Sequence, residues 1–211
     1  MPARSTRRPH SHARRKLGVD GMRHARSVVD RAWADLPAAH RALLRAIGAD
    51  RCKVVDRPLG EEIADLRHSA ALEALDLSQQ RRLNQALGVW LPELRLVVID
   101  AVHENHTALD EGSYAAALAR VAWHEWGHAL SIDRATDEDI AAGERLLSIA
   151  PPGIATIIRS GGYRSKEQTH ELLAEIYALL VARRRLGQTG RPKWLAEEIW
   201  NLTKRVTGWP E

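Results

Sequence analysis

The chain has 211 residues, of which 45% are hydrophobic, and it carries 31 Lys and Arg against 27 Asp and Glu. This length suits one domain, and the hydrophobic content excludes a wholly disordered chain. The single cysteine, Cys52, excludes an internal disulfide framework and any zinc site built from several cysteines. A bound metal must therefore be held by histidine and carboxylate side chains. No stretch approaches the roughly 20 apolar residues that a membrane-spanning helix needs.

The positive charge is concentrated at the start of the chain. Residues 1–26 hold eight Arg and Lys and one Asp, whereas the remaining residues hold 23 basic and 26 acidic side chains. We therefore predict a basic, disordered arm over 1–26 and one domain over 27–211. Because the arm lacks the apolar segment of a secretory signal peptide, a cytoplasmic location is the default expectation, with export by a route that reads other signals as the alternative. Weak contact of the arginines with nucleic acid or an anionic membrane is a second interpretation of the arm.

Helical periodicity dominates the chain after the arm. Apolar residues at helical spacing predict helices over 28–36, 37–48, 61–75 and 78–87. Pro37 suits the first turn of the second of these helices, and Ser78 is the expected N-cap of the fourth. Two β-rich runs, at 52–56 and 94–100, predict strands, the second being either an edge strand that pairs with an extended substrate or a plain core strand. These elements predict a predominantly α-helical α+β fold with a small sheet.

The clearest chemical motif is HEWGH, an HExxH sequence within an apolar helical stretch that Asp110 or Ser113 can cap. On a helix, His124 and His128 lie one turn apart on the same face, so that both imidazoles can bind one cation. Glu125 lies beside them, where it suits a general base acting on metal-bound water. An apolar stretch would not carry these side chains without partners, since burying them alone is costly. The motif therefore predicts a zinc site.

Two histidines do not complete a tetrahedral zinc site, so a third ligand must come from elsewhere in the chain. The extended pattern HExxHxxGxxH is excluded, because Ser131 and Arg134 stand where a glycine and a third histidine would be required. Asp133 is close in sequence, but it lies at the end of the same helix on an unfavourable face. A more distant segment is the better source of the ligand.

An acidic pair in a downstream helix meets this need. Ser165 and Gln168 resemble a capping box that opens a helix, and Glu171 and Glu175 follow on a common flank at i and i+4. The two glutamates interrupt an apolar run instead of lying on a face rich in Lys and Arg. We predict that Glu171 binds the metal and that Glu175 accepts a hydrogen bond from a ligand histidine.

The string HEWGHAL, followed by a tyrosine and then HELLAEIYALL, resembles the zinc metallopeptidase domain of anthrax toxin lethal factor and its relatives over residues 121–181. These are gluzincins, in which a Glu on a downstream helix completes an HExxH site. The separation of Glu171 from His124 is close to the family spacing, and the string Glu-Leu-Leu-Ala-Glu ending at Glu175 matches the family pattern. The resemblance implies a zincin-like fold, zinc binding by Glu171, and an assisting role for Tyr163 in the reaction.

These residues predict a zinc-dependent metallopeptidase that cuts internal bonds of a protein or peptide, with endopeptidase favoured over aminopeptidase activity. One Zn²⁺ per chain would be held by His124, His128 and Glu171, with Glu125 as general base and Tyr163 assisting. The alternative is a non-catalytic zinc-containing module with a regulatory or nucleic-acid-binding role. A structural zinc site has no need of a base beside two of its ligands, which favours the enzyme.

A second group of polar residues precedes the motif helix. His103, Glu104 and His106 lie within four positions of one another. They either line the substrate cleft, add to metal affinity or form a hydrated loop.

Overall fold

The structure is a computed structural model of the chain, and it describes residues 17–103, 109–161 and 163–210. In chain order its main elements are α1 (Val19–Asp35), α2 (Ala38–Ala46), β1 (Cys52–Val55), α3 (Leu59–Ser69), α4 (Leu77–Leu83), β2 (Gly88–Leu91), β3 (Leu96–Asp100), α6 (Glu111–Arg134), α7 (Asp137–Leu146), α8 (Pro152–Ser160), α9 (Ser165–Arg185) and α10 (Glu197–Thr207). The predominantly α-helical α+β class is confirmed. None of the described helices is both long and apolar enough to cross a membrane.

The three strands form one sheet in the order β1-β3-β2, with β1 parallel and β2 antiparallel to β3. Val98, in the middle of β3, pairs with Lys53 on one side and with Val89 on the other. The 94–100 run therefore supplies the central strand, and its predicted role as an edge strand is wrong. Every residue of β3 is buried, and its apolar side chains at 96–99 alternate between two clusters on opposite faces of the sheet.

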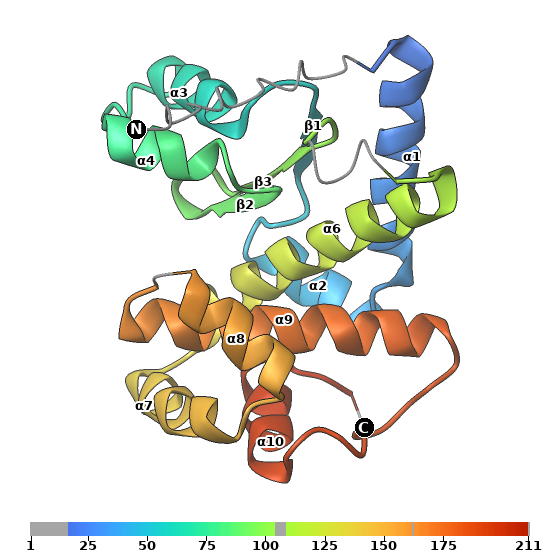
Figure 1. Cartoon of the computed structure of the whole chain (residues 1–211), viewed down its shortest axis with the longest axis vertical. Helices are drawn as coiled ribbons and strands as arrows, with labels where there is room; N and C mark the ends of the chain where they lie inside the picture. The colour runs from blue at the N-terminus through green and yellow to red at the C-terminus, as the bar shows by residue number, and fades with distance from the viewer. Residues whose placement is uncertain (1–16, 104–108, 162, 211) are drawn as a thin grey trace, which may run out of the picture.

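Different helices lie on the two sides of the sheet (Figure 1). On one face, α3 and α4 cover the smaller cluster. On the other face, α6 packs against β2 and β3, and the main core continues through α1, α8 and α9. The long helices α6 and α9 pack against each other on the side of α6 away from the sheet (Figure 1). The HExxH helix is thus held between the sheet and the helix that carries the acidic pair.

Close approach of α6 and α9 requires a glycine in the motif. A Cβ atom on Gly127 would lie 2.9 Å from the Cα of Ala174 and 3.2 Å from the Cβ of Tyr177. Real Cβ atoms essentially never approach another backbone atom so closely. Because Ala174 lies between Glu171 and Glu175 in α9, this contact fixes how far both carboxylates lie from the motif helix.

A buried hydrogen-bond network fixes α9 from its other side. The Nδ1 of His40 lies 3.1 Å from the hydroxyl of Tyr177, and its Nε2 lies 3.0 Å from the carbonyl oxygen of Gly208. Burial lowers the pKa of His40 to about 4, so the ring is neutral near pH 7. The Nε2–H then donates to the carbonyl and Nδ1 accepts from the phenol. This network ties α9 to α2 and to the end of α10.

The predicted boundary of the N-terminal arm at residue 26 is wrong. Helix α1 begins at Val19, so residues 19–26 belong to the folded domain. Ala25 is fully buried and Met22 packs against the main core, which extends the apolar stripe of α1 toward the start of the chain. The rest of the arm, residues 1–16, lies outside the described residues.

Other helix ends also differ from the predictions, and α4 ends at Leu83 instead of residue 87. Helix α3 ends at Ser69, before the expected end at residue 75, and Ala71 adopts a left-handed conformation with φ 54°. Helix α4 is capped by Asp76, whose side chain accepts a hydrogen bond from the backbone N–H of Gln79. The predicted cap, Ser78, instead donates its hydroxyl to Asp76. The helix therefore begins at Leu77, with a carboxylate as its cap two positions before the predicted serine.

Candidate metal centre

Helix α6 carries both histidines of the motif on one face. Its N-cap is Asp110, whose carboxylate accepts a hydrogen bond from the backbone N–H of Ser113 at 3.0 Å. The Nε2 atoms of His124 and His128 lie 2.9 Å apart, as expected for residues one turn apart that face a common point. Both side chains are mostly buried.

Glu171 reaches this point from α9. Its Oε2 lies 3.5 Å from the Nε2 of His124, and its Oε1 lies 3.3 Å from the Nε2 of His128. Across the described ranges, this is the one group of three or more His, Cys, Asp and Glu whose donor atoms all lie within 4.8 Å of one another. Ligand atoms at about 2.0–2.1 Å from a tetrahedral zinc are about 3.3 Å apart. The two imidazoles and the carboxylate therefore fit a zinc ion in both chemistry and spacing.

Glu175, one turn further along α9, contacts the other ring nitrogen of His124. Its Oε1 lies 3.3 Å from the Nδ1 of His124, and its Oε2 lies 2.8 Å from the Nη2 of Arg120. When His124 donates Nδ1–H to this carboxylate, the lone pair of its Nε2 faces the shared point. Sequence reasoning identified Glu175 but missed Arg120. The signal was available, since Arg120 lies one helical turn before His124.

The histidines and carboxylates of this site shift each other's pKa values. Burial disfavours a charge on His124, but hydrogen bonds to Glu171 and Glu175 outweigh burial and raise its pKa to about 10. Burial likewise opposes ionisation of Glu171, whereas its hydrogen bonds to the two histidines outweigh burial and hold its pKa well below the usual range. A mostly buried pair of ionised carboxylates stabilises a positive charge at this point, which a protonated His124 or a bound divalent cation would supply.

Glu125 lies between α6 and the edge strand β2. Its side chain is only 6% exposed, and burial raises its pKa, while the backbone N–H of Trp90 donates a hydrogen bond to the carboxylate. A Cβ atom on Gly88 would lie 2.9 Å from the Cγ of Glu125, so the glycine makes room for the glutamate. The sequence analysis missed strand β2 and both of these residues. The glycine before three apolar residues was their only local signal.

The start of α9 places Tyr163 beside the ligand group. The backbone N–H of Arg164 donates to the carboxylate of Glu167, and the amide of Gln168 donates to the carbonyl oxygen of Tyr163. The predicted capping box of Ser165 and Gln168 is therefore wrong, because the N-cap lies one residue earlier. The side chain of Gln168 supports the tyrosine instead of the helix terminus.

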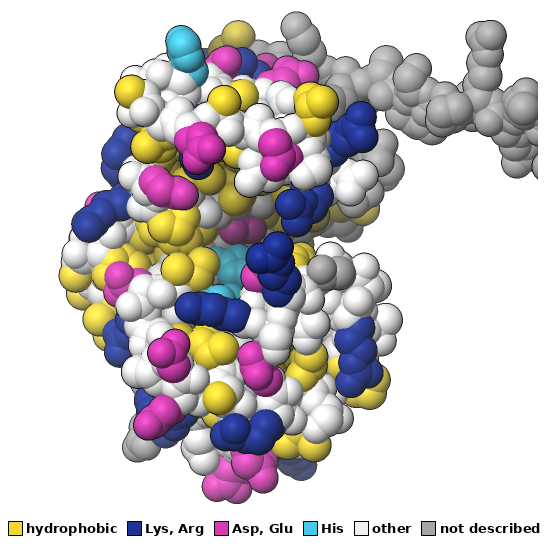
Figure 2. Space-filling view, turned by 90° about the vertical axis from the view of Figure 1, so that its left-hand side faces the viewer, with side chains coloured by type: hydrophobic (Ala, Val, Ile, Leu, Met, Phe, Trp, Pro, Cys, Tyr) yellow, Lys and Arg dark blue, Asp and Glu magenta, His cyan; other side chains and the backbone are white. Residues whose placement is uncertain are grey.

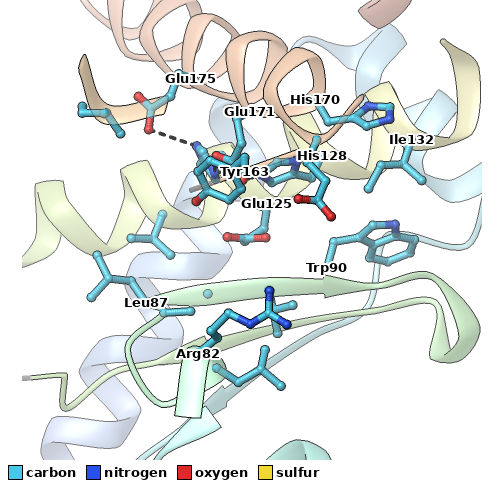
Figure 3. Close-up of a pocket in the computed structure, with 18 of the residues that line it drawn as sticks. Arg82, Leu87, Trp90, Glu125, His128, Ile132, Tyr163, His170, Glu171 and Glu175 are labelled. Carbon is cyan, nitrogen blue, oxygen red and sulfur yellow. Dashed lines mark hydrogen bonds and ion pairs between the residues drawn. The ribbon is translucent and has the colours of Figure 1, made fainter. Parts of the chain in front are cut away.

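The phenol of Tyr163 is half-buried and points toward Glu171 (Figure 3). Burial raises its pKa, and the charge of Glu171 and a hydrogen bond with that carboxylate add to the effect, so the phenol stays protonated and able to donate. A Cβ atom on Gly161 would overlap the Tyr163 ring. The ring therefore depends on a glycine two residues before it.

An open cleft of about 850 Å³ lies over the candidate ligand group of His124, His128 and Glu171. Residues of α4 and β2 form one wall, and residues of α6, α8 and α9 form the other (Figure 3). Figure 2 shows this hollow from its open side, with histidine at its floor and hydrophobic side chains on the wall above it. His124, Glu125, His128, Tyr163 and Glu171 all line the cleft. The predicted functional residues are thus brought together on one accessible surface.

Other candidates lie elsewhere. Asp133 is exposed near the end of α6 and is not part of the ligand group. His103 is 6% exposed and does not line the cleft, so the predictions that it lines the cleft or belongs to a hydrated loop do not hold for this residue. Glu104 and His106 lie outside the described residues.

Comparison of the chain with protein-family models, curated proteins and solved structures found no match. The resemblance to the lethal factor peptidase domain stays a prediction from the motif.

Proposed function

We propose that this chain is a zinc-dependent metallopeptidase that hydrolyses internal peptide bonds and has a zincin-like fold of the lethal factor type. One observation carries the proposal. His124, His128 and Glu171 converge within 4.8 Å of one another at the floor of an open cleft, with Glu125 beside them on the same helix. The donor set is that of a gluzincin, in which three protein ligands leave a fourth position for water.

The residues around the site support a hydrolytic role. When bound, zinc supplies a Lewis acid that lowers the pKa of a coordinated water toward about 7 and polarises the scissile carbonyl. Glu125 is positioned to accept a proton from the attacking water and to return it to the leaving amine, and its raised pKa brings it nearer to the pH at which it must do both. The protonated phenol of Tyr163 is positioned to donate a hydrogen bond to the developing oxyanion.

The cleft supports a protein or peptide substrate. It is a solvent-accessible hollow between the two walls, large enough to receive a segment of a peptide chain (Figure 2). β2 is the edge strand on the cleft side, and its residues Gly88, Val89 and Trp90 line the cleft. An extended backbone can add to such an edge through main-chain hydrogen bonds. A non-catalytic zinc module would need neither the cleft nor the buried base.

Removal of the metal tests the proposal. The purified chain, loaded with one equivalent of Zn²⁺, is expected to cleave at least some members of a mixed peptide library at internal bonds, as read by mass spectrometry. Dialysis against a chelator should abolish cleavage, and added Zn²⁺ should restore it. A chain that binds zinc stoichiometrically and cleaves no peptide or protein would contradict the peptidase and favour the non-catalytic module.

Substitution of Gly161 tests the role of Tyr163 without altering the tyrosine. Gly161→Ala has an unstrained backbone, since φ is −71° in the native chain, but the new methyl group overlaps the phenol ring. We expect unchanged zinc content and a fall in kcat of about 10²-fold, the usual cost of losing one oxyanion donor. Tyr163→Phe should lose a similar amount. Gly153→Ala, at the start of α8 and with nothing within 4 Å of the new atom, is the control. Full activity in Tyr163→Phe would exclude the assisting role.

A further inference from the structure

The cleft presents apolar surface on both walls. Leu83 and Val89 belong to the α4 and β2 wall, and Ile132 and Ile157 belong to the opposite wall. The two isoleucines are 44% and 49% exposed, so about half of their surface is not buried in the core and is available to a ligand. Apolar lining of this kind favours a ligand with apolar side chains.

Most charged side chains of the cleft already have partners within the chain. Glu171 contacts both motif histidines, and Glu175 binds Arg120 at 2.8 Å. The carboxylate of Glu167 accepts the backbone N–H of Arg164 at 2.9 Å. A charged side chain of a substrate would have to compete with these contacts.

Arg82 is the exception. It lies on α4, is exposed, and lines the cleft on the β2 side, opposite Glu171 and Glu175 of α9 (Figure 3). Within the described part of the chain, no carboxylate forms an ion pair with its guanidinium. Asp76 is close enough for Arg82 to lower its pKa, but the hydrogen bonds of its Oδ1 go to Ser78 and Gln79 at the start of α4. The guanidinium is therefore available to form an ion pair with a negatively charged group that enters the cleft.

We propose that Arg82 selects substrates carrying an Asp or Glu side chain in the segment that occupies the cleft, next to apolar residues that pack on its walls. This inference rests on the proposed peptidase function and adds a substrate class, an acidic and apolar protein segment. A guanidinium binds a carboxylate through two parallel hydrogen bonds, and the apolar lining strengthens the pair relative to one in open water. A Lys or Arg side chain at the same position would be repelled by Arg82.

A charge-reversal experiment with a matched control tests this selection. Peptides with one apolar core are compared in which Glu, Gln or Lys is placed in turn at each flanking position. At the best position, we expect kcat/KM of the zinc-loaded wild type to be about 5- to 10-fold higher for Glu than for Gln, and lower still for Lys. Arg82→Glu should invert the order, and Arg82→Gln should abolish it. Arg81→Glu makes the same charge change at an exposed neighbour that does not line the cleft, and it should keep the wild-type order.

Binding supplies a second readout that does not depend on turnover. The zinc-loaded Glu125→Gln chain, with and without Arg82→Glu, is titrated with the same peptides carrying a fluorophore, and anisotropy reports the affinity. A Glu preference that Arg82→Glu reverses and Arg81→Glu retains supports the inference. Cleavage with no preference for Glu, or a preference that survives Arg82→Glu, overturns the inference and leaves the proposed function intact. Binding with the Glu preference but no cleavage by the wild type supports the role of Arg82 and overturns the peptidase function.

Discussion

Glu125→Gln is expected to keep its zinc and to lose peptide hydrolysis by about 10²–10⁴-fold in kcat, the usual contribution of general acid–base catalysis. The amide has the shape of the carboxylate and can still accept the hydrogen bond from the backbone N–H of Trp90. It cannot take a proton from the attacking water. Because His124, His128 and Glu171 are untouched, elemental analysis should find the same metal content as in the wild type.

Two measurements separate loss of the base from loss of the fold. Burial makes ionisation of Glu125 costly, so the neutral glutamine should leave the melting temperature unchanged or raise it. Glu198→Gln removes the charge of an exposed glutamate on α10 and should retain the full rate. Hydrolysis by Glu125→Gln within a few-fold of the wild-type rate would contradict the mechanism and assign the base to another group.

The motif helix could be predicted because its information is local. His124 and His128 are one turn apart in any α-helix, so the geometry of two ligands follows from secondary structure alone. The acidic pair was found for a related reason, since Glu171 and Glu175 break an apolar run and therefore need a buried partner. That partner proved to be the histidine pair of the other long helix.

The parts that the sequence did not reveal depend on contacts between distant segments. β2 is only four residues long. Its Gly88 leaves space for the side chain of Glu125, and the backbone N–H of its Trp90 donates a hydrogen bond to that carboxylate. Glu125 follows these residues by more than thirty positions, so the sequence does not show these contacts. The central place of β3 depends on which strands flank it, and its own residues do not encode that choice. Two of the predicted helix caps were wrong for a different reason. Ser78 and Ser165 are acceptable caps, but neighbouring residues took the position.

The link from Arg120 to the metal ligands illustrates how local and distant information combine. Its place one turn before His124 is visible in the sequence, but an arginine there reads equally well as a solvated surface residue. Only the position of Glu175 on α9 gives it a role, because that carboxylate uses one oxygen for His124 and the other for Arg120. A solvated helical face therefore could not be told from a functional one until both helices were placed.

Glu171→Ala is expected to lose the metal. The substitution removes the third ligand and leaves two imidazoles, so zinc should fall from about one per chain to a small fraction after dialysis, and competition with a chromophoric chelator should show a loss in affinity well beyond that of any supporting residue. Glu175→Gln is the matched comparison, because it lies one turn away and contacts the same His124 without facing the shared point. It should keep zinc and bind it about 10–100-fold more weakly, the usual cost of losing a partner that orients a ligand histidine.

If Glu171→Ala retained a full equivalent of zinc while Glu175→Gln lost it, the ligand and supporting roles of the two glutamates would be reversed. Circular dichroism of the metal-free proteins should be the same for both variants, since each change lies at the cleft and leaves the packing of α9 on Gly127 in place.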